Sequence, residues 1–164
     1  MSPEELLARL DALGVAHRTV SHAAVFTVAE SRALRGALPG AHSKNLFLRR
    51  RDGGFALAVL EEGRQASVNA LARLAGWGRV RMAGADELRA TLGVEPGSVT
   101  PFGLVHAAPG SVAVLLDAAL AGAGTAWFHP LVNTRSTALA GAELVRVLRE
   151  WGHAPLVLGL EESL

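Results

Sequence analysis

Three short segments of the chain carry side chains whose types and spacing could do chemistry. In Ser43-Lys44-Asn45-Leu46-Phe47-Leu48, an ammonium group and a carboxamide stand at the mouth of an alternating segment that is typical of a strand. Strand ends are places where a rigid scaffold holds polar groups against a ligand. The alternative is a solvated lysine that precedes a purely structural strand.

The other two segments are a stiff loop and a histidine. Pro96-Gly97-Ser98-Val99-Thr100-Pro101 could offer backbone N–H groups to a carbonyl or a phosphate, although a plain connecting loop has the same pattern. Phe128-His129-Pro130-Leu131-Val132-Asn133 places an imidazole at the end of a predicted strand, directly before a proline. A histidine in that position is either a ligand-facing group or a structural one.

Composition separates these segments from the rest of the chain. Lys44 is the one lysine among 16 basic residues, isoleucine and tyrosine are absent, and asparagine occurs three times. This bias is typical of a GC-rich genome, so residues with AT-rich codons that persist against it are candidates for function. They cluster: Lys44, Asn45 and Phe47 lie within four positions, and Phe128, His129 and Asn133 lie within six.

Several chemistries find no support in the sequence. Without cysteine there is no disulfide, thiolate zinc site or cysteine nucleophile. The six histidines form no helical ligand pair, so we expect no metal and no other cofactor. Gly122-Ala123-Gly124 is typical of an ordinary turn, and neither a Walker loop nor a Gly-x-Ser-x-Gly elbow occurs.

Charge and hydropathy indicate a soluble globular protein. Half of the 164 residues are hydrophobic, 19% are charged and the net charge is +1, which excludes a disordered chain. No apolar run is long enough for a membrane helix, and the acidic start is unlike a signal peptide, so we expect one cytoplasmic domain over residues 1–164. The run Arg49-Arg50-Arg51 is either a solvated face or a patch that engages a few phosphates.

Periodicity and capping signals predict short helices interleaved with short strands. The helices are expected at 3–13, 28–35, 68–75, 85–92 and 140–151. The strands are expected at 16–20, 45–50, 55–60, 104–106, 112–116, 125–128, 134–139 and 156–160. Because strict βαβ periodicity is missing, the predicted fold class is α+β, with a mixed β-sheet surrounded by helices in a single compact domain.

Taken together and in order, the segments resemble a known family. Val25-Phe26-Thr27, His42-Ser43-Lys44-Asn45-Leu46-Phe47-Leu48, Gly97-Ser98-Val99-Thr100-Pro101-Phe102 and His129-Pro130-Leu131-Val132-Asn133 are similar to motifs of the YbaK/prolyl-tRNA synthetase-associated editing domains. The likeness covers nearly the whole chain and is greatest to the free-standing branch that deacylates alanine mischarged on tRNA(Pro). Ser43 stands where that family would be expected to have threonine.

The resemblance implies a trans-editing aminoacyl-tRNA deacylase that works without a metal. It implies catalytic roles for Lys44 and Asn45, backbone contacts from Gly97, Ser98, Val99, Thr100 and Pro101, and a pocket lined by His129. We expect the apolar residues Phe26 and Val25 as further lining residues, although packing in the core also explains them. The implied partner is mischarged tRNA, most simply tRNA(Pro), with prolyl-tRNA synthetase as a transient partner and the protein itself a monomer. A deacylase for Cys, Ser or Thr, a non-catalytic tRNA- or synthetase-binding module, and a small-molecule-binding domain remain alternatives.

Overall fold

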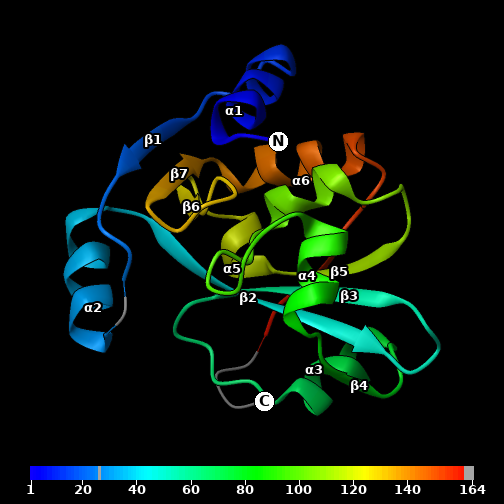
Figure 1. Cartoon of the computed structure of the whole chain (residues 1–164). Coiled ribbons are helices and arrows are strands. Elements are labelled where there is room, and N and C mark those ends of the chain that lie inside the picture. Colours follow the sequence, from blue (N-terminus) through cyan, green and yellow to red (C-terminus); the bar gives the residue numbers. More distant parts are fainter. Residues whose placement is uncertain (26, 161–164) are drawn as a thin grey trace.

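The computed structural model describes residues 1–25 and 27–160 and is organised around one mixed sheet (Figure 1). In this part of the chain the sheet has eight strands: β1 (Arg18–Ser21), β2 (Ala41–Arg50), β3 (Phe55–Glu61), β4 (Val80–Met82), β5 (Val112–Asp117), β6 (Ala126–Phe128), β7 (Arg135–Leu139) and β8 (Leu156–Leu158). Helices surround it: α1 (Pro3–Ala12), α2 (Val28–Ala37), α3 (Val68–Ala75), α4 (Ala85–Leu92), the 3-10 helix η1 (Pro101–His106), α5 (Ala118–Ala121) and α6 (Gly141–Glu150).

Strand β2 lies at the centre of the sheet, and its two ends pair with different neighbours. It pairs antiparallel with β3 over most of its length, runs parallel to β6 at its start, and pairs antiparallel with β4 at its end. The complete order is β1-β7-β6-β2-β3-β5-β8, with β4 beside β2. Parallel and antiparallel pairs both occur, which confirms the predicted mixed α+β fold.

Side-chain caps start three of the helices where the sequence predicts them. Ser2, Thr27 and Ser67 accept hydrogen bonds from backbone N–H groups three residues later, which satisfies donors that a helix start leaves free. The longest helices have 10 residues. Across the described ranges, no helix is long and apolar enough to cross a membrane.

The sheet buries apolar side chains on both faces. The larger cluster takes residues from α1, α4, η1 and α6, whereas a second cluster packs against α3 and a third, small one against α2. Phe47 belongs to the larger cluster and its neighbour Leu48 to the α3 cluster, so successive side chains of β2 face opposite sides of the sheet. This alternation determines which way the polar residues at the start of β2 point.

One predicted strand is wrong. Residues 104–106 form the end of the helix η1, because Thr100 caps the preceding turn through a hydrogen bond from Phe102 N to its Oγ1, and Pro101 occupies the first helical position. Phe102 and Leu104 are fully buried in the larger cluster, and tertiary packing overrides the short β-like pattern. Strand β4 and helix α5 were not predicted.

The start of β2 is also earlier than predicted. The strand begins at Ala41, whose N–H donates to Thr125 O at 2.9 Å, and the Ala41–Ala126 and His42–Trp127 pairs extend it alongside β6. Lys44 and Asn45 therefore lie within a paired strand rather than at its mouth. Pairing with β6, more than 80 residues away, rather than local sequence, sets this boundary.

Candidate functional site

Two adjoining cavities open beside the first half of β2 and share Ser43 and His129. The first, here called the lysine cavity, is lined by Ser43, Lys44, Asn45, Gly97, Val99 and His129. The second, the helix cavity, lies between α2 and the sheet, and its wall includes Val25, Leu34, Phe128, Ser31, Glu62 and Ser136. The two shared residues are 86 positions apart in the chain, so the fold brings distant segments together at one place.

Lys44 and Asn45 are neighbours on β2, and both line the lysine cavity. Their cross-strand partners belong to different apolar clusters, so their side chains leave opposite faces of the strand. Lys44 pairs with Leu60, which belongs to the α3 cluster, and its Nζ donates a hydrogen bond to the backbone carbonyl of Arg64. Asn45 pairs with Val59, which belongs to the larger cluster. An ammonium group has three N–H donors, so the Arg64 carbonyl leaves donors for a ligand.

The Asn45 carboxamide has a fixed orientation and an unpartnered oxygen. Ser43 Oγ donates to the carbonyl of Trp127 at 2.9 Å, so it can only accept from Asn45, and Asn45 Nδ2 lies 3.4 Å from it. Turning the amide over would put two acceptors together, which fixes the oxygen on the other side. Asn45 Oδ1 is buried and has no hydrogen-bond partner within the described chain.

The structure brings only part of the Gly97–Pro101 loop to the cavity. Gly97 and Val99 line it, whereas Ser98, Thr100 and Pro101 are buried and absent from its wall. Gly97 has a φ of 90°, which few other residues adopt, and an added Cβ there would lie 3.5 Å from Asn133 Nδ2. The Gly97 backbone is thus the part of this loop that approaches both the cavity and the segment after His129.

The segment after β6 holds His129 in a defined tautomer. His129 Nδ1 lies 3.1 Å from the carbonyl of Arg135, and because a carbonyl only accepts, Nδ1 carries the proton. Nε2 of the neutral ring is then left as an acceptor. Two residues on, Leu131 has a φ of 71°, a backbone conformation rare for a residue with a side chain, so this bend is held by the surrounding packing.

Burial lowers the pKa of His129 below its ordinary value of 6.5. The hydrogen bond to the Arg135 carbonyl opposes this shift, and the charge of nearby His22 adds to it. In the pH window between the lowered pKa of the folded protein and 6.5, the unfolded chain binds more protons than the folded one. The free energy of unfolding should therefore fall as the pH is lowered through that window.

Replacing His129 by glutamine should remove this acid-side loss of stability. Glutamine does not titrate, so the free energy of unfolding of His129→Gln should decline less between pH 7.5 and 5.5 than that of the wild type. Urea denaturation of both proteins at the two pH values measures the difference. Equal declines would show that His129 does not titrate differently in the folded state.

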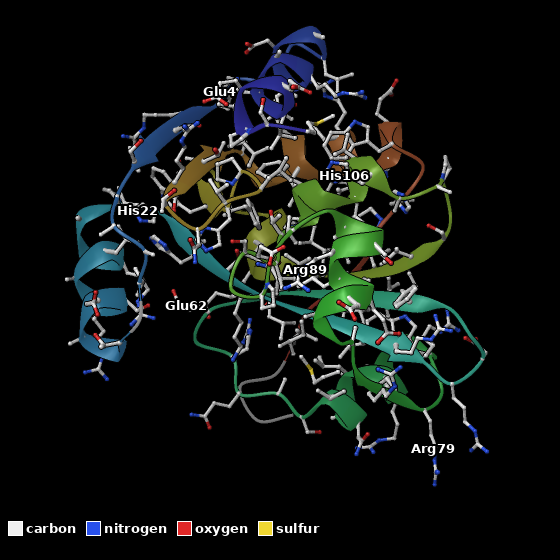
Figure 2. All side chains as sticks on the ribbon, viewed as in Figure 1. Glu4, His22, Glu62, Arg79, Arg89 and His106 are labelled. Carbon is white, nitrogen blue, oxygen red and sulfur yellow. The ribbon has the colours of Figure 1, made fainter. Side chains whose placement is uncertain are left out.

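Sequence reasoning missed the polar residues that surround His129. His22 Nδ1 donates to the Ala23 carbonyl at 2.8 Å, which leaves His22 Nε2 as the acceptor for the Ser136 hydroxyl, also at 2.8 Å. Glu62 lies 2.6 Å from Arg35 and accepts from Ser31 in the helix cavity. Figure 2 shows His22 and Glu62 beside α2. Only the paired strands and the packed helix bring these residues together, so spacing gives no signal for them.

Two further points concern the predicted lining residues Val25 and Phe26 and the groups that could bind a metal. Val25 lines the helix cavity, whereas Phe26 lies outside the described residues. In residues 1–25 and 27–160, no group of three or more His, Asp or Glu side chains could hold a metal ion.

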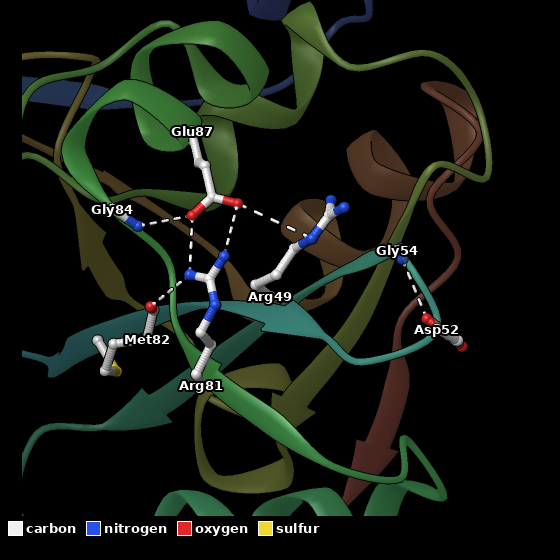
Figure 3. Close-up of polar contacts among 7 residues, drawn as sticks. All are labelled: Arg49, Asp52, Gly54, Arg81, Met82, Gly84 and Glu87. Carbon is white, nitrogen blue, oxygen red and sulfur yellow. Dashed lines mark hydrogen bonds and ion pairs between the residues drawn. The ribbon is translucent and has the colours of Figure 1, made fainter.

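An arginine-rich depression lies at the far end of β2 from the cavities. It is lined by Arg49, Arg50, Arg51, Arg79, Val80 and Arg81. Glu87 holds both Arg81, at 2.9 Å, and Arg49, at 3.8 Å, while it also accepts from Gly84 N (Figure 3). Arg51 and Arg79 are exposed and have no ion pair within the described ranges, and Figure 2 shows Arg79 pointing away from the ribbon. These two side chains are available to anions.

Comparisons with known proteins find a matching family and similar relatives. The family model described as "Aminoacyl-tRNA editing domain" matches residues 22–147. The chain is 34% identical over 160 residues to the prolyl-tRNA synthetase associated domain-containing protein 1 of Bos taurus, covering 94% of this chain and 93% of that protein. It is 26% identical over 151 residues to the prolyl-tRNA editing protein ProX of Acetoanaerobium sticklandii, covering 92% of each.

Solved structures show the same fold. A structure described as a candidate trans-editing enzyme for prolyl tRNA synthetase superposes with a TM-score of 0.74 at 23% identity and covers 98% of both chains. The family match includes every residue that lines the lysine cavity. As its motifs predict, the chain belongs to the family of aminoacyl-tRNA editing domains, the YbaK/prolyl-tRNA synthetase-associated editing domains.

Proposed function

We propose that this protein is a trans-acting deacylase that hydrolyses the ester of mischarged Ala-tRNA(Pro). The observation that carries the proposal is the lysine cavity, where Lys44, Asn45, Gly97 and His129 meet from three distant segments. Membership of the editing-domain family supports it, as does the name of the ProX relative, a prolyl-tRNA editing protein.

The residues suit the hydrolysis of an aminoacyl ester, which is already activated and needs no strong nucleophile. The neutral His129 ring would use Nε2 to accept from the terminal 2′-hydroxyl or a water. The Lys44 ammonium would hold the phosphate of the terminal adenosine or the aminoacyl group, and Asn45 would assist it. Orientation can supply about 7–11 kcal/mol of the barrier and oxyanion donors about 3 kcal/mol more, so no metal is required.

Selectivity for alanine would come from size. The wall of the helix cavity presents apolar side chains, including Val25, Leu34 and Phe128, directly beside the shared residues Ser43 and His129. A fixed wall rejects a larger proline ring by steric overlap, which is easier than preferring a larger ligand through extra methylenes worth about 1 kcal/mol each.

The test is hydrolysis of Ala-tRNA(Pro) by the purified protein, with Pro-tRNA(Pro) alongside and a chelator present. Fast loss of alanine only, unaffected by the chelator, is the expected result. Ser-, Thr- or Cys-charged tRNA cleaved faster than Ala-tRNA(Pro) would keep the reaction and change the substrate. Cleavage of none of these esters would overturn the deacylase proposal.

A non-catalytic tRNA-binding module is the second candidate, because the arginine-rich depression could bind RNA without any chemistry. Both candidates share the tRNA partner, and we further expect a cytoplasmic monomer that meets prolyl-tRNA synthetase transiently. Binding of tRNA that is not accompanied by faster ester loss would favour the module.

Replacing Arg51 or Arg79 by alanine should weaken tRNA binding. Each exposed guanidinium that contacts a phosphate releases counterions, so its loss should lower the slope of log affinity against log salt by about 0.7–0.9. Filter binding between 50 and 200 mM salt measures it. Arg89→Ala is the matched control, since Arg89 is also an exposed arginine but is held by Glu95 at 2.8 Å. Slopes that match the wild type in both variants would contradict phosphate contacts at this depression.

A further inference from the structure

Asp117 is the one acidic residue that is buried in residues 1–25 and 27–160, and its side chain has no solvent exposure. It ends β5 and accepts four hydrogen bonds. Oδ2 accepts from Glu61 N and Arg64 Nε, both at 2.9 Å, and Oδ1 accepts from Ala119 N at 3.0 Å and an Arg64 terminal nitrogen at 3.4 Å. A buried carboxylate is tolerated only when its oxygens are satisfied in this way.

These bonds fix the turn that follows β3. Asp117 binds the first residue of the turn through Glu61 N and the last through the Arg64 guanidinium, while Arg64 N donates to Glu61 O at 3.0 Å. Burial alone would raise the pKa of Asp117, but the bonds from Arg64, Glu61 and Ala119 outweigh it and lower that pKa. The carboxylate is therefore ionised at neutral pH, and the turn is pinned to the end of β5 by a charge-assisted pair.

The last residue of this turn, Arg64, is also the hydrogen-bond partner of Lys44. The Arg64 carbonyl accepts from Lys44 Nζ, and Lys44 pairs across the strands with Leu60, next to the start of the turn. A lysine side chain has four rotatable bonds and no fixed direction of its own. Its ammonium group is therefore placed by the carbonyl, and the carbonyl is placed by Asp117.

We propose that Asp117 and Arg64 are positioning residues for the editing site, which hold the Arg64 carbonyl where it directs the Lys44 ammonium group to the lysine cavity. The proposal rests on the proposed deacylase function. Neither residue lines the lysine cavity, so both act through Lys44. The Lys44 ammonium group then keeps one position, and its remaining N–H donors are available to the substrate.

The chain offers a direct readout of this link, because Lys44 is its only lysine. In full-length protein grown with ¹³C,¹⁵N-lysine, every lysine signal reports Lys44. We compare wild type with Asp117→Asn, which keeps the shape and removes the charge, and with Arg64→Gln, which keeps the backbone carbonyl and removes the guanidinium. Both should shift the Lys44 side-chain signals and raise the rate of Lys44 acetylation by acetic anhydride severalfold.

Deacylation is measured on the same proteins. A misplacement near 1 Å costs up to about 100-fold in rate, so kcat for Ala-tRNA(Pro) should fall by about 10- to 100-fold while KM changes less than twofold. Leu10→Ala is the control for general destabilisation, because Leu10 is fully buried on α1 and belongs to the core rather than to the site. It should lower stability but leave the Lys44 signals, acetylation and kcat unchanged.

Two outcomes overturn the proposal. If the Lys44 signals and the acetylation rate of Arg64→Gln match those of the wild type, Asp117 and Arg64 do not direct the Lys44 ammonium group. This conclusion holds even if Asp117→Asn fails to fold. Shifted signals with an unchanged kcat show that the position of Lys44 does not matter to the reaction. Failure of the wild type to cleave any aminoacyl ester is a separate result, which removes the proposed function and leaves the signal comparison to decide the link.

Discussion

Replacing Lys44 by alanine should reduce kcat/KM for Ala-tRNA(Pro) by about 100- to 1000-fold, the range seen when one transition-state donor is removed. The free energy of unfolding should change by only about 1 kcal/mol, because the folded protein loses one hydrogen bond, to the Arg64 carbonyl. Single-turnover deacylation and urea denaturation of the same preparation measure the two quantities. A large loss of activity in a stable protein separates a role in the site from a role in the fold.

Lys44→Arg refines this expectation. Arginine keeps the charge but replaces a compact ammonium group with a planar fork, which does not match the single carbonyl acceptor that Arg64 presents to Lys44. We therefore expect most of the activity to be lost in this variant as well. Arg73→Ala on α3 provides a control for the loss of one positive charge outside the cavity. Full activity in Lys44→Ala would exclude Lys44 from the reaction.

The five helices predicted from the sequence all occur, and three of them begin where local chemistry determines it. Ser2, Thr27 and Ser67 each cap a helix with their own side chain, and a cap acts over only three residues. Residues 104–106 were predicted wrongly because their apolar pattern suits a strand and a buried 3-10 turn equally. The choice between them depends on Thr100 and on packing in the core, neither of which a short window reveals.

The residues of the candidate site also fall into those that the local sequence identifies and those that it does not. Lys44, Asn45, Gly97 and His129 could be identified because each stands in a segment with an unusual composition or a family motif. Asp117, the last residue of the apolar strand β5, could be noticed in the sequence only as an acid at a strand end. Its partners come from the parallel pairing of β3 with β5, which joins residues more than 50 positions apart. Long-range strand pairing of this kind is not encoded in local patterns.

Replacing Asn45 by alanine should lower activity without lowering stability. Asn45 Oδ1 is a buried acceptor without a partner in the described chain, and such an atom costs a folded protein about 1–3 kcal/mol. Alanine removes that cost together with the weak 3.4 Å bond to Ser43, so the free energy of unfolding should stay constant or rise. An acceptor kept at this cost suits a substrate donor, such as the α-ammonium group or the 2′-hydroxyl, and deacylation should fall by about 10- to 100-fold.

The predicted changes in deacylation and in the free energy of unfolding differ in direction, which distinguishes a role in the site from a role in the fold. A residue that only supports the fold loses stability and activity together, whereas an unsatisfied group held ready for a ligand loses activity alone. Asn69→Ala is the matched control, because Asn69 is an exposed asparagine on α3, and neither quantity should change there. A loss of about 1 kcal/mol or more in the free energy of unfolding of Asn45→Ala would mean that a group within the protein donates a hydrogen bond to Asn45 Oδ1. That result would contradict the proposal that this oxygen accepts from a donor of the substrate.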